Sequence, residues 1–577
     1  MSDFDIEKLL KQISELEAEL KTAKKYGLVW DKENTKEDIV LECETHIPVL
    51  KIDSSKTLIK GKINNLIIEG DNYHALVALN YTYKGRVDII YIDPPYNTGG
   101  DDFIYNDRYV NDDDGYRHSK WLQFMSKRLK LSVDLLKDNG IIFISIGDDE
   151  LFNLKLLSDS IFGPQNFISC CPRIAKRTSN KGNYFKPTKD YVLVYAKNKS
   201  LIDWKFGASN KVQEKDFKYV DERGRYKKNG ASLYQPSLDS RPNQRYFIEC
   251  PDGSLIIPPG TVFPAEKKDG AFVKPLSNRD KCWRWSVQTY LQNKDKLMFT
   301  KASSTCPLID SEGNPSKWNI YDKVYLDDKV DETLLPEDVI YDYVNSQGTK
   351  EVLDQGLNFS FAKPVGLIKY LIKLSKYPKD AVVLDYFAGS GTTGQAVLEL
   401  NDEDGGNRRF ILCTNNENKI CEEVTYPRMK IVITGKRLDG SKYSDGIPAN
   451  LFYLKTDFIK DEANTEQAKY NLVEKVDALL CIAENVFNEV ERNDYSSHFA
   501  CDNKHLFIYS DYYNVQKFEE FKSRVLLAKG EKIVYVYSSD NSVDDSLINH
   551  PNVVLKPIPS KIYEIYKEIV EDIKRGE

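Results

Sequence analysis

The chain has 577 residues, which is too long for one hydrophobic core and predicts three or four domains. Charged residues make up 29% and hydrophobic residues 41%, as in ordinary soluble proteins, and no apolar run approaches the roughly 18 residues that span a bilayer. The formal net charge of −7 does not indicate nucleic-acid binding by the chain as a whole. The ten cysteines include no CxxC pair and the amino terminus lacks a secretory pattern, so we expect buried thiols, no metal site and a cytoplasmic protein without membrane contact.

The first 25 residues predict a helix with a narrow apolar seam. Apolar side chains recur at alternate spacings of three and four residues, the pattern of a short coiled coil, at Ile6, Leu9, Ile13, Leu16 and Leu20. Self-association through this helix predicts a homodimer. Because so short a seam is marginal alone, packing on its own domain is the alternative.

The stretch Asn65–Glu69 is short and apolar and predicts a buried strand. Gly70 interrupts it, and a helix is expected over about residues 73–83. Asp71 stands just before that helix, where an aspartate commonly caps the first backbone amides.

A second strand, residues 87–92, is followed at once by Asp93, Pro94, Pro95 and Tyr96. This tetrapeptide therefore stands at the carboxyl end of a strand, the edge at which open α/β sheets bind ligands. Two prolines stiffen the loop and remove two donors, which leaves carbonyl groups able to accept. A carboxylate, carbonyls and an aromatic plane in one small volume suit a planar amine, whereas a plain turn after a core strand is the alternative.

Polar and apolar segments then alternate. Residues 99–117 are rich in aspartate, lack periodicity and predict a mobile lid over the site. An amphipathic helix is expected over residues 121–136 and a buried strand over residues 141–146. The acidic run 148–150 follows that strand and favours a helix start over a metal site.

Two further strands are expected at residues 167–171 and 191–196, as a reversed hairpin at the end of the sheet. The loop between them, Arg173–Lys189, has six basic residues and no acidic one, with Tyr184 and Phe185 among them. Basic residues beside aromatic side chains suit phosphate contacts and base stacking, and an ordinary solvated loop is the alternative. The candidate DNA contacts are Arg173, Lys176, Arg177, Lys181 and Lys186.

Residues 198–357 change character, with Pro, Gly, Tyr, Trp and charges of both signs and no long helical periodicity. Two short runs carry Arg, Asn or Gln beside aromatic side chains, which is the chemistry that reads base edges. The alternative is that these side chains only pack the domain. The candidate base contacts are Arg241, Asn243, Gln244 and Arg284.

The second motif lies far downstream. Residues 381–384 predict a strand, residues 385–393 spell DYFAGSGTT, and a helix is expected over residues 394–400. Glycines let the backbone approach a ligand closely, and a helix N-terminus offers amide donors. The three-glycine spacing of a dinucleotide fold and the lysine of a phosphate loop are both missing.

The segments around this motif complete the predicted elements. A helix is expected to begin at Lys363-Pro364, and residues 409–414 predict the next strand. Residues 451–577 form a second α/β block without a catalytic signature, which predicts an assembly or DNA-clamping domain. Its expected elements are strands at 506–509 and 532–537 and helices at about 471–491 and 560–575.

The order of the two motifs, VDIIYIDPPYNTG then FAGSGTT with a long insertion between them, resembles that of β-class DNA amino-methyltransferases. The resemblance covers most of residues 65–437, and GDNYHAL and TNNENKICEEVTYPR look most like the modification subunits of type III restriction–modification systems. It implies transfer of a methyl group from S-adenosylmethionine to adenine N6 in double-stranded DNA by base flipping. The DPPY spelling favours adenine, and a restriction (helicase–nuclease) subunit is the further partner that the resemblance allows.

The resemblance also implies roles for single residues. Asp93 and the Pro94 carbonyl would accept from the adenine amino group, and Tyr96 would stack on the base. In the wider fold, an acid at the end of the strand that corresponds to residues 409–414 commonly binds the ribose hydroxyls. Here two asparagines come before Glu417, so Asn416 or Glu417 is left for that role. The expected cofactor-binding residues are Asp71, Lys363, Asp385, Phe387, Gly389, Gly391, Thr392 and Asn416.

The expected fold is α/β, a doubly wound, Rossmann-like methyltransferase sheet. Its expected parts are an N-terminal helical segment (1–45), a catalytic half (46–197), a target-recognition domain (198–357), a cofactor-binding half (358–450) and a C-terminal α/β domain (451–577). The alternatives are cytosine-N4 methylation, an unpaired type II or solitary methyltransferase, and an RNA acceptor. In a different class stands a non-catalytic DNA-binding specificity protein, against which the intact motifs argue.

Overall fold

The computed structural model describes residues 28–575 except 33–34, 101–102, 107, 180–181, 183, 203–205, 210–213, 231, 235–240, 331–332, 461–470, 472–474, 512–514, 538–547, 549 and 559–560. The expected coiled-coil seam lies outside the described residues. The chain divides into two compact units, Met1–Phe206 with Pro336–Glu577, and Gly207–Leu335. The inserted unit is thus shorter at both ends than the expected 198–357.

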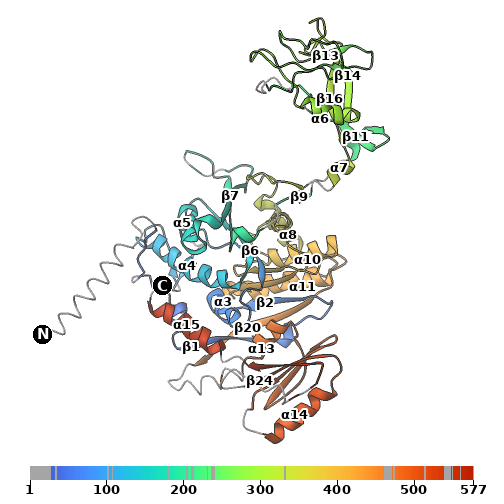
Figure 1. Ribbon diagram of the computed structural model, residues 1–577. Helices are drawn as coiled ribbons and strands as arrows, with labels where there is room; N and C mark the ends of the chain where they lie inside the picture. The colour runs from blue at the N-terminus through green and yellow to red at the C-terminus, as the bar shows by residue number, and fades with distance from the viewer. Residues whose placement is uncertain are drawn as a thin grey trace, which may run out of the picture. The chain divides into compact units, whose positions relative to one another are not determined.

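Within the described residues, the larger unit is built on a nine-stranded sheet in the order β1-β20-β2-β19-β18-β3-β6-β8-β7 (Figure 1). The strands from β20 to β6 run parallel, β1 pairs antiparallel with β20, and the antiparallel hairpin β7–β8 ends the other side. This topology confirms the doubly wound sheet and its reversed hairpin. The strands are β1 (His46–Ile52), β2 (Asn64–Glu69), β3 (Val87–Ile92), β6 (Leu136–Ile146), β7 (Phe167–Ile174), β8 (Lys189–Ala196), β18 (Val382–Asp385), β19 (Arg409–Thr414) and β20 (Asn450–Lys460).

The central strands are short and mostly apolar, as expected for strands that are covered on both faces. Every residue of β3 and of β18 is buried. The cover comes from helices that pack in pairs, α3 on α4 and α9 on α10. The helices of this unit that flank the sheet are α2 (Asp38–Glu42), α3 (Asn72–Asn80), α4 (Arg117–Leu135), α5 (Leu151–Phe162), α8 (Asn345–Asp354), α9 (Val365–Leu374), α10 (Thr392–Asp404) and α11 (Tyr426–Thr434).

The segment expected as a mobile lid is anchored instead. It carries the short hairpin β4 (Ile104–Tyr105) and β5 (Arg108–Tyr109), and Phe103, Tyr105 and Val110 are buried in the main core. The Tyr105 hydroxyl also donates to the Thr35 carbonyl oxygen at 2.6 Å. The many aspartates in this segment concealed the three hydrophobic anchors, so the expectation of an unanchored lid is wrong.

The inserted unit has a hydrophobic core of its own. Trp283 and Tyr246 are fully buried in it, and the Trp283 indole donates to the Tyr246 carbonyl oxygen at 2.8 Å. Its described elements are β9 (Ala208–Ser209), β10 (Tyr219–Asp221), β11 (Gly224–Lys228), β12 (Ile248–Glu249), β13 (Leu255–Ile257), α6 (Val287–Gln292), β14 (Leu297–Lys301), β15 (Ile309–Asp310), β16 (Trp318–Tyr325), α7 (Asp327–Val330) and β17 (Thr333–Leu334).

The C-terminal block adds a second sheet, with five strands among the described residues. The two expected strands and the last expected helix are confirmed, but the helix expected over 471–491 is wrong in its second half. Asn485 adopts a left-handed conformation (φ 57°) that ends α13, and a strand follows. The elements are α13 (Asp477–Glu484), β21 (Asn488–Asn493), β22 (Ser496–Cys501), β23 (Lys504–Tyr509), α14 (Val515–Leu527), β24 (Glu531–Tyr537), β25 (Val553–Ile558) and α15 (Lys561–Arg575).

Candidate active site

The two sequence motifs meet at one edge of the main sheet. β3 and β18 are parallel neighbours, with Ile89 opposite Val383 and Ile90 opposite Leu384. Since the carboxyl ends of parallel strands lie at the same edge, the loop that starts at Asp93 emerges beside the loop that follows Asp385.

The Asp93 carboxylate is held by a lysine from a distant part of the chain. Lys363 Nζ donates to both carboxylate oxygens, at 2.7 and 2.6 Å, and the same nitrogen lies 5.0 Å from the centre of the Tyr96 ring. Pro364 follows Lys363 at the N-cap of α9, and a proline disfavours the helical conformation for the residue before it. The sequence predicted Lys363 as a cofactor ligand, whereas the contact present is with Asp93.

Tyr96 is oriented from two sides. Its ring lies against the backbone at Gly147, where a Cβ atom would stand only 2.8 Å from Tyr96 Cδ2. Its hydroxyl donates to Asp190 Oδ2 at 3.3 Å. Burial, aided by the charge of Asp93, raises the pKa of Tyr96 well above its ordinary value, so the side chain remains a neutral phenol.

Arg173 is not a surface residue, which corrects its assignment as a phosphate contact. It is fully buried; its Nε donates to Asp190 Oδ1 at 2.7 Å, a second guanidinium nitrogen donates to Oδ2, and a third donates to the Tyr343 carbonyl oxygen at 2.6 Å. A buried guanidinium whose donors are used in this way cannot reach DNA. Arg173 and Asp190 instead join the two ends of the basic loop beside Tyr96.

Several other described residues of the basic loop face solvent. Lys176, Arg177 and Lys186 are exposed, and Lys181 lies outside the described residues. Tyr184 and Phe185 are 95% and 92% exposed. Large aromatic side chains left this exposed between basic residues are available to a partner.

The proline loop is stabilised by residues that sequence reasoning missed. The Trp121 indole, fully buried, donates to the Pro95 carbonyl oxygen at 2.7 Å, and Pro94 is buried. Asn97 adopts a left-handed conformation (φ 56°) and donates to the buried Glu150 carboxylate at 2.5 Å. The position of Glu150, an acid at the carboxyl end of a predicted strand, was the available signal.

The Asp385 side chain stabilises the glycine loop by hydrogen bonds within it. Its buried carboxylate accepts from the Phe387 backbone N–H at 3.0 Å and from the Thr393 hydroxyl at 2.5 Å. Burial, with a smaller contribution from the charge of Asp93, raises the pKa of Asp385 to about 7. The prediction that Asp385 contacts the cofactor is therefore corrected, because both oxygens are turned into the loop.

Thr392 also acts within the protein. Its buried hydroxyl donates to the Lys363 carbonyl oxygen at 3.2 Å and accepts from Arg428 at 3.0 Å, so this side chain bonds within the protein, and a cofactor contact by Thr392 stays a prediction. The glycines differ in surroundings. A Cβ atom on Gly391 (φ 80°) would stand 3.3 Å from Thr425 Cγ2 in the interior, whereas one on Gly389 (φ 47°) would meet nothing nearer than Phe359 Cζ at 3.6 Å.

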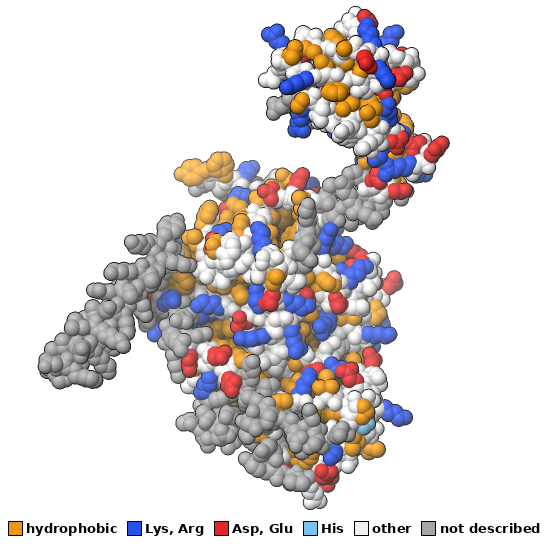
Figure 2. Space-filling model, in the orientation of Figure 1, with side chains coloured by type: hydrophobic (Ala, Val, Ile, Leu, Met, Phe, Trp, Pro, Cys, Tyr) orange, Lys and Arg blue, Asp and Glu red, His pale blue; other side chains and the backbone are white. Residues whose placement is uncertain are grey.

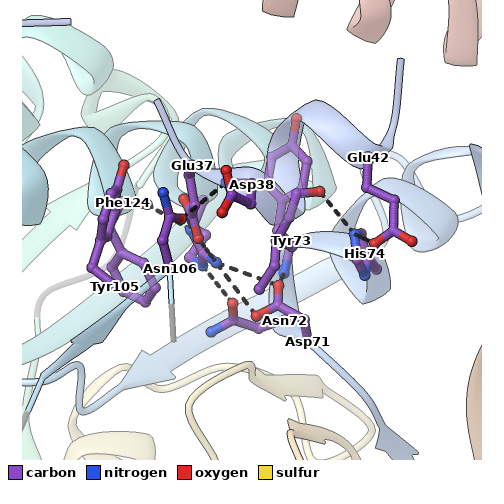
Figure 3. Close-up of polar contacts among 12 residues, drawn as sticks. Glu37, Asp38, Glu42, Asp71, Asn72, Tyr73, His74, Tyr105, Asn106 and Phe124 are labelled. Atoms are coloured by element: carbon purple, nitrogen blue, oxygen red, sulfur yellow. Dashed lines mark hydrogen bonds and ion pairs between the residues drawn. The ribbon is translucent and has the colours of Figure 1, made fainter. Parts of the chain in front are cut away.

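Asp71 belongs to a buried polar network (Figure 3). It caps α3 by accepting from the Tyr73 backbone N–H at 2.7 Å, and Arg128 lies 3.3 Å from its Oδ1. Arg128 is fully buried and also donates to both oxygens of Glu37, at 2.9 and 2.7 Å. The sequence signal for Arg128 was its place seven residues after Trp121, on the buried face of α4.

The network extends to the glycine loop through Asn72. Its side-chain amide accepts from Arg128 and donates to the Tyr386 carbonyl oxygen at 2.9 Å. The loop after β2 and the loop after β18 are thereby fixed to each other. At the end of β19, Asn416 accepts from the Glu422 backbone N–H at 3.1 Å.

In the inserted unit only part of the predicted DNA-reading set is accessible. Arg241 and Asn243 are exposed. Gln244 is buried and donates to the Arg284 carbonyl oxygen at 3.3 Å, while Arg284 itself is ion-paired with Asp322. The predicted base contact at Gln244 is corrected, because its buried side chain bonds within the same unit, whereas that at Arg284, whose side chain is 23% exposed, stays a prediction.

The acidic run 148–150 ends at the start of α5, in agreement with the helix-start interpretation. Among the described residues, no cluster of three or more His, Cys, Asp and Glu side chains could hold a metal ion. Within the same part of the chain, no helix has the length and apolar character needed to cross a membrane.

The chain belongs to the DNA methylase family, whose sequence model matches residues 87–425. It is 34% identical over 401 residues to the type III restriction-modification enzyme StyLTI Mod subunit of Salmonella typhimurium (63% of this chain, 55% of the relative). It is 33% identical over 388 residues to the EcoPI Mod subunit of Escherichia phage P1 (61% and 58%), and 30% identical over 368 residues to the type II methyltransferase M.KpnI of Klebsiella pneumoniae (60% and 79%). The chain thus spans little more than half the length of these Mod relatives.

Solved structures show a weaker likeness. The cytosine-N4-specific PvuII DNA methyltransferase matches with a TM-score of 0.28 at 11% identity, over 62% of this chain and 86% of that one. The M1.HpyAVI–SAM complex matches with a TM-score of 0.26 at 14% identity, over 63% and 98%. At these TM-scores the likeness does not bear on substrate or cofactor.

Replacing Arg128 by methionine should lower the free energy of unfolding by about 3–5 kcal/mol, because Glu37 would remain a buried carboxylate without its partner. Denaturant unfolding measures the change. The exposed Arg177→Met is the matched control and should shift stability by no more than about 0.5 kcal/mol. An Arg128→Met protein as stable as the control would show that the network does not hold the loops.

The raised pKa of Asp385 predicts a pH dependence of stability. The folded chain retains a proton that the unfolded chain releases near an ordinary aspartate pKa of about 4, so this group makes the fold less stable as the pH rises from about 4 to about 7. Asp385→Asn stays neutral throughout. The free energy of unfolding, measured across this range, should fall in the wild type relative to the variant up to about pH 7. Above that pH the difference between the two proteins should be constant. If the two plots of unfolding free energy against pH were parallel throughout, the raised pKa of Asp385 would be contradicted.

Proposed function

We propose that this chain transfers a methyl group from S-adenosylmethionine to the N6 amino group of adenine in double-stranded DNA. The observation that carries the proposal is the meeting, at neighbouring strand ends, of the Asp93–Tyr96 loop and the glycine loop. Membership of the DNA methylase family supports the reaction type. The whole activity remains a proposal, since the chain covers 55% and 58% of two of its Mod relatives.

The residues at this edge fit the cofactor. A Cβ atom on Gly389 would make only ordinary contacts, with Phe359 Cζ at 3.6 Å and the Phe387 carbonyl oxygen at 3.9 Å, and the Phe387 side chain is partly exposed. Asp71 would accept from the adenine amino group of the cofactor, Asn416 or Glu417 would bind the ribose hydroxyls, and Lys363 would pair with the methionine carboxylate. When bound, S-adenosylmethionine supplies an electrophilic sulfonium methyl group.

The chain's own residues then prepare the adenine. The amino nitrogen is a weak nucleophile because its lone pair is delocalised into the ring. The Asp93 carboxylate and the Pro94 carbonyl oxygen each accept a hydrogen bond from this amino group. These two hydrogen bonds draw the nitrogen toward tetrahedral geometry and stabilise the positive charge that develops on it. Tyr96, fixed by Gly147 and Asp190, presents a stacking plane that offsets part of the few kcal/mol that base flipping costs.

DNA contacts are assigned to exposed groups alone. Lys176, Arg177 and Lys186 would bind phosphates, and Arg241 and Asn243 are the exposed candidates for reading bases. On the face in Figure 2, Lys and Arg side chains lie among Asp and Glu rather than in one large basic field. We place non-specific DNA affinity in the exposed basic loop, because a net charge of −7 does not attract DNA.

The relatives indicate the kind of enzyme system in which we place this chain. Several are Mod subunits of type III restriction-modification enzymes, and we propose the same role, as modification subunit beside a restriction subunit. The similarity to M.KpnI, a type II methyltransferase, supports the alternative of an unpaired type II methyltransferase. A homodimer remains a proposal from the heptad pattern, which lies outside the described residues.

The chemical proposal predicts distinct losses for two residues. Asp93→Ala removes an acceptor used chiefly in the transition state, so methyl transfer should fall by orders of magnitude while cofactor and DNA still bind. Tyr96→Phe keeps the stacking plane and should retain much of the activity, whereas Tyr96→Ala should lose far more. Single-turnover transfer with nucleoside mass spectrometry measures all three; a wild-type rate in Asp93→Ala would overturn the mechanism.

The basic loop predicts a change in salt dependence. Replacing Lys176, Arg177 and Lys186 by glutamine should weaken binding to all duplexes alike and flatten the plot of log affinity against log salt by up to about one slope unit per lost contact. Lys442→Gln, at an exposed lysine outside the loop, is the control. If the triple variant changed only which sites are methylated, the loop would be a sequence reader and the assignment would fail.

A further inference from the structure

The Lys363 ammonium stands where the proposed function needs the adenine amino group. It donates to both oxygens of Asp93, at 2.7 and 2.6 Å, and lies 5.0 Å from the centre of the Tyr96 ring. In the proposed function, the adenine amino group donates to the Asp93 carboxylate and the base lies on the Tyr96 ring. The Lys363 nitrogen therefore contacts the same two side chains as the substrate would. Lys363 therefore resembles an internal substitute for the substrate.

The two nitrogens compete for the same acceptors. With Lys363 in place, both Asp93 oxygens already accept from a cation. The reaction would also build positive charge on the adenine nitrogen, and an ammonium at the same carboxylate would repel that charge. Productive binding of adenine therefore requires Lys363 to release Asp93.

The backbone of Lys363 limits where the side chain can go. Its carbonyl oxygen accepts from Thr392 in the glycine loop at 3.2 Å, and Pro364 fixes the residue at the start of α9. The residue is thus tied to the cofactor loop while only its flexible stem reaches Asp93. An anion bound beside the glycine loop lies within the natural range of that stem, and the methionine carboxylate is the anion that the proposed cofactor brings.

We propose that Lys363 exchanges partners, from Asp93 to the cofactor carboxylate, so that cofactor binding makes Asp93 available to adenine. This inference rests on the proposed function and adds an order to it, cofactor first and flipped base second. The exchange is a coupling between two sites, and such coupling must be reciprocal. DNA that carries the target adenine should tighten cofactor binding by the same factor by which the cofactor tightens DNA binding.

Equilibrium binding with two cofactor analogues tests the exchange. S-adenosylhomocysteine carries the amino-acid carboxylate, and methylthioadenosine lacks it. In the wild type, S-adenosylhomocysteine should tighten binding of a duplex containing a mapped methylation site about tenfold, and methylthioadenosine should have little effect. With purine, which has no amino group, in place of the target adenine, the tightening should disappear. Equal effects of the two analogues on the wild type would overturn the exchange without any variant.

Lys363→Met gives the complementary result. The variant should bind the adenine duplex without cofactor about as tightly as the wild type does with S-adenosylhomocysteine, and should bind S-adenosylhomocysteine more weakly while methylthioadenosine affinity is unchanged. Lys369→Met, six residues further on in α9 and paired with Glu399 and Glu403, is the matched control and should keep wild-type coupling. Full coupling in Lys363→Met would overturn the exchange. A wild type that methylates DNA but shows no coupling rejects the exchange alone, and one that methylates no DNA rejects the proposed function with it.

Discussion

The parallel pairing of β3 with β18 is the constraint on which the site depends. These strands are separated by about half the chain, yet the register that sets Ile90 opposite Leu384 brings Asp93 and the glycine loop to one edge. Neither loop alone defines a reaction. A glycine loop could hold many ligands, and an acid after a strand could cap a helix, but together they fit the cofactor site and the amine acceptor that we propose.

Buried charges fix the loops that this pairing brings together. Arg128 joins the loop after β2 to Glu37, Arg173 joins the ends of the basic loop, and Lys363 holds Asp93. A buried guanidinium or carboxylate is costly unless it is paired, so each pair penalises conformations in which the loops separate. Rigid loops suit methyl transfer, because positioning supplies much of the catalysis. The pair of Lys363 with Asp93 is the one that the proposed partner exchange would open.

Much of the sheet could be predicted from the sequence. The strand over residues 409–414 was predicted to the residue, because a central parallel strand is a continuous apolar run with clear breaks at both ends. Composition could not show which charged residues are buried. Arg173 looked like one of six basic loop residues, and only its pairing with Asp190 across the hairpin removes it from the surface. Lys363 was predicted beside the cofactor, but its contact with Asp93 joins residues 270 positions apart.

The central claim is that this site methylates adenine N6 in double-stranded DNA. Incubation of the wild-type chain with isotopically labelled S-adenosylmethionine and mixed duplex DNA, followed by digestion and nucleoside mass spectrometry, tests it most directly. We expect labelled N6-methyladenine as the product, and none from the same DNA when Asp93→Ala replaces the wild type. Labelled N4-methylcytosine would contradict the base assignment, and unlabelled DNA would contradict the proposed activity.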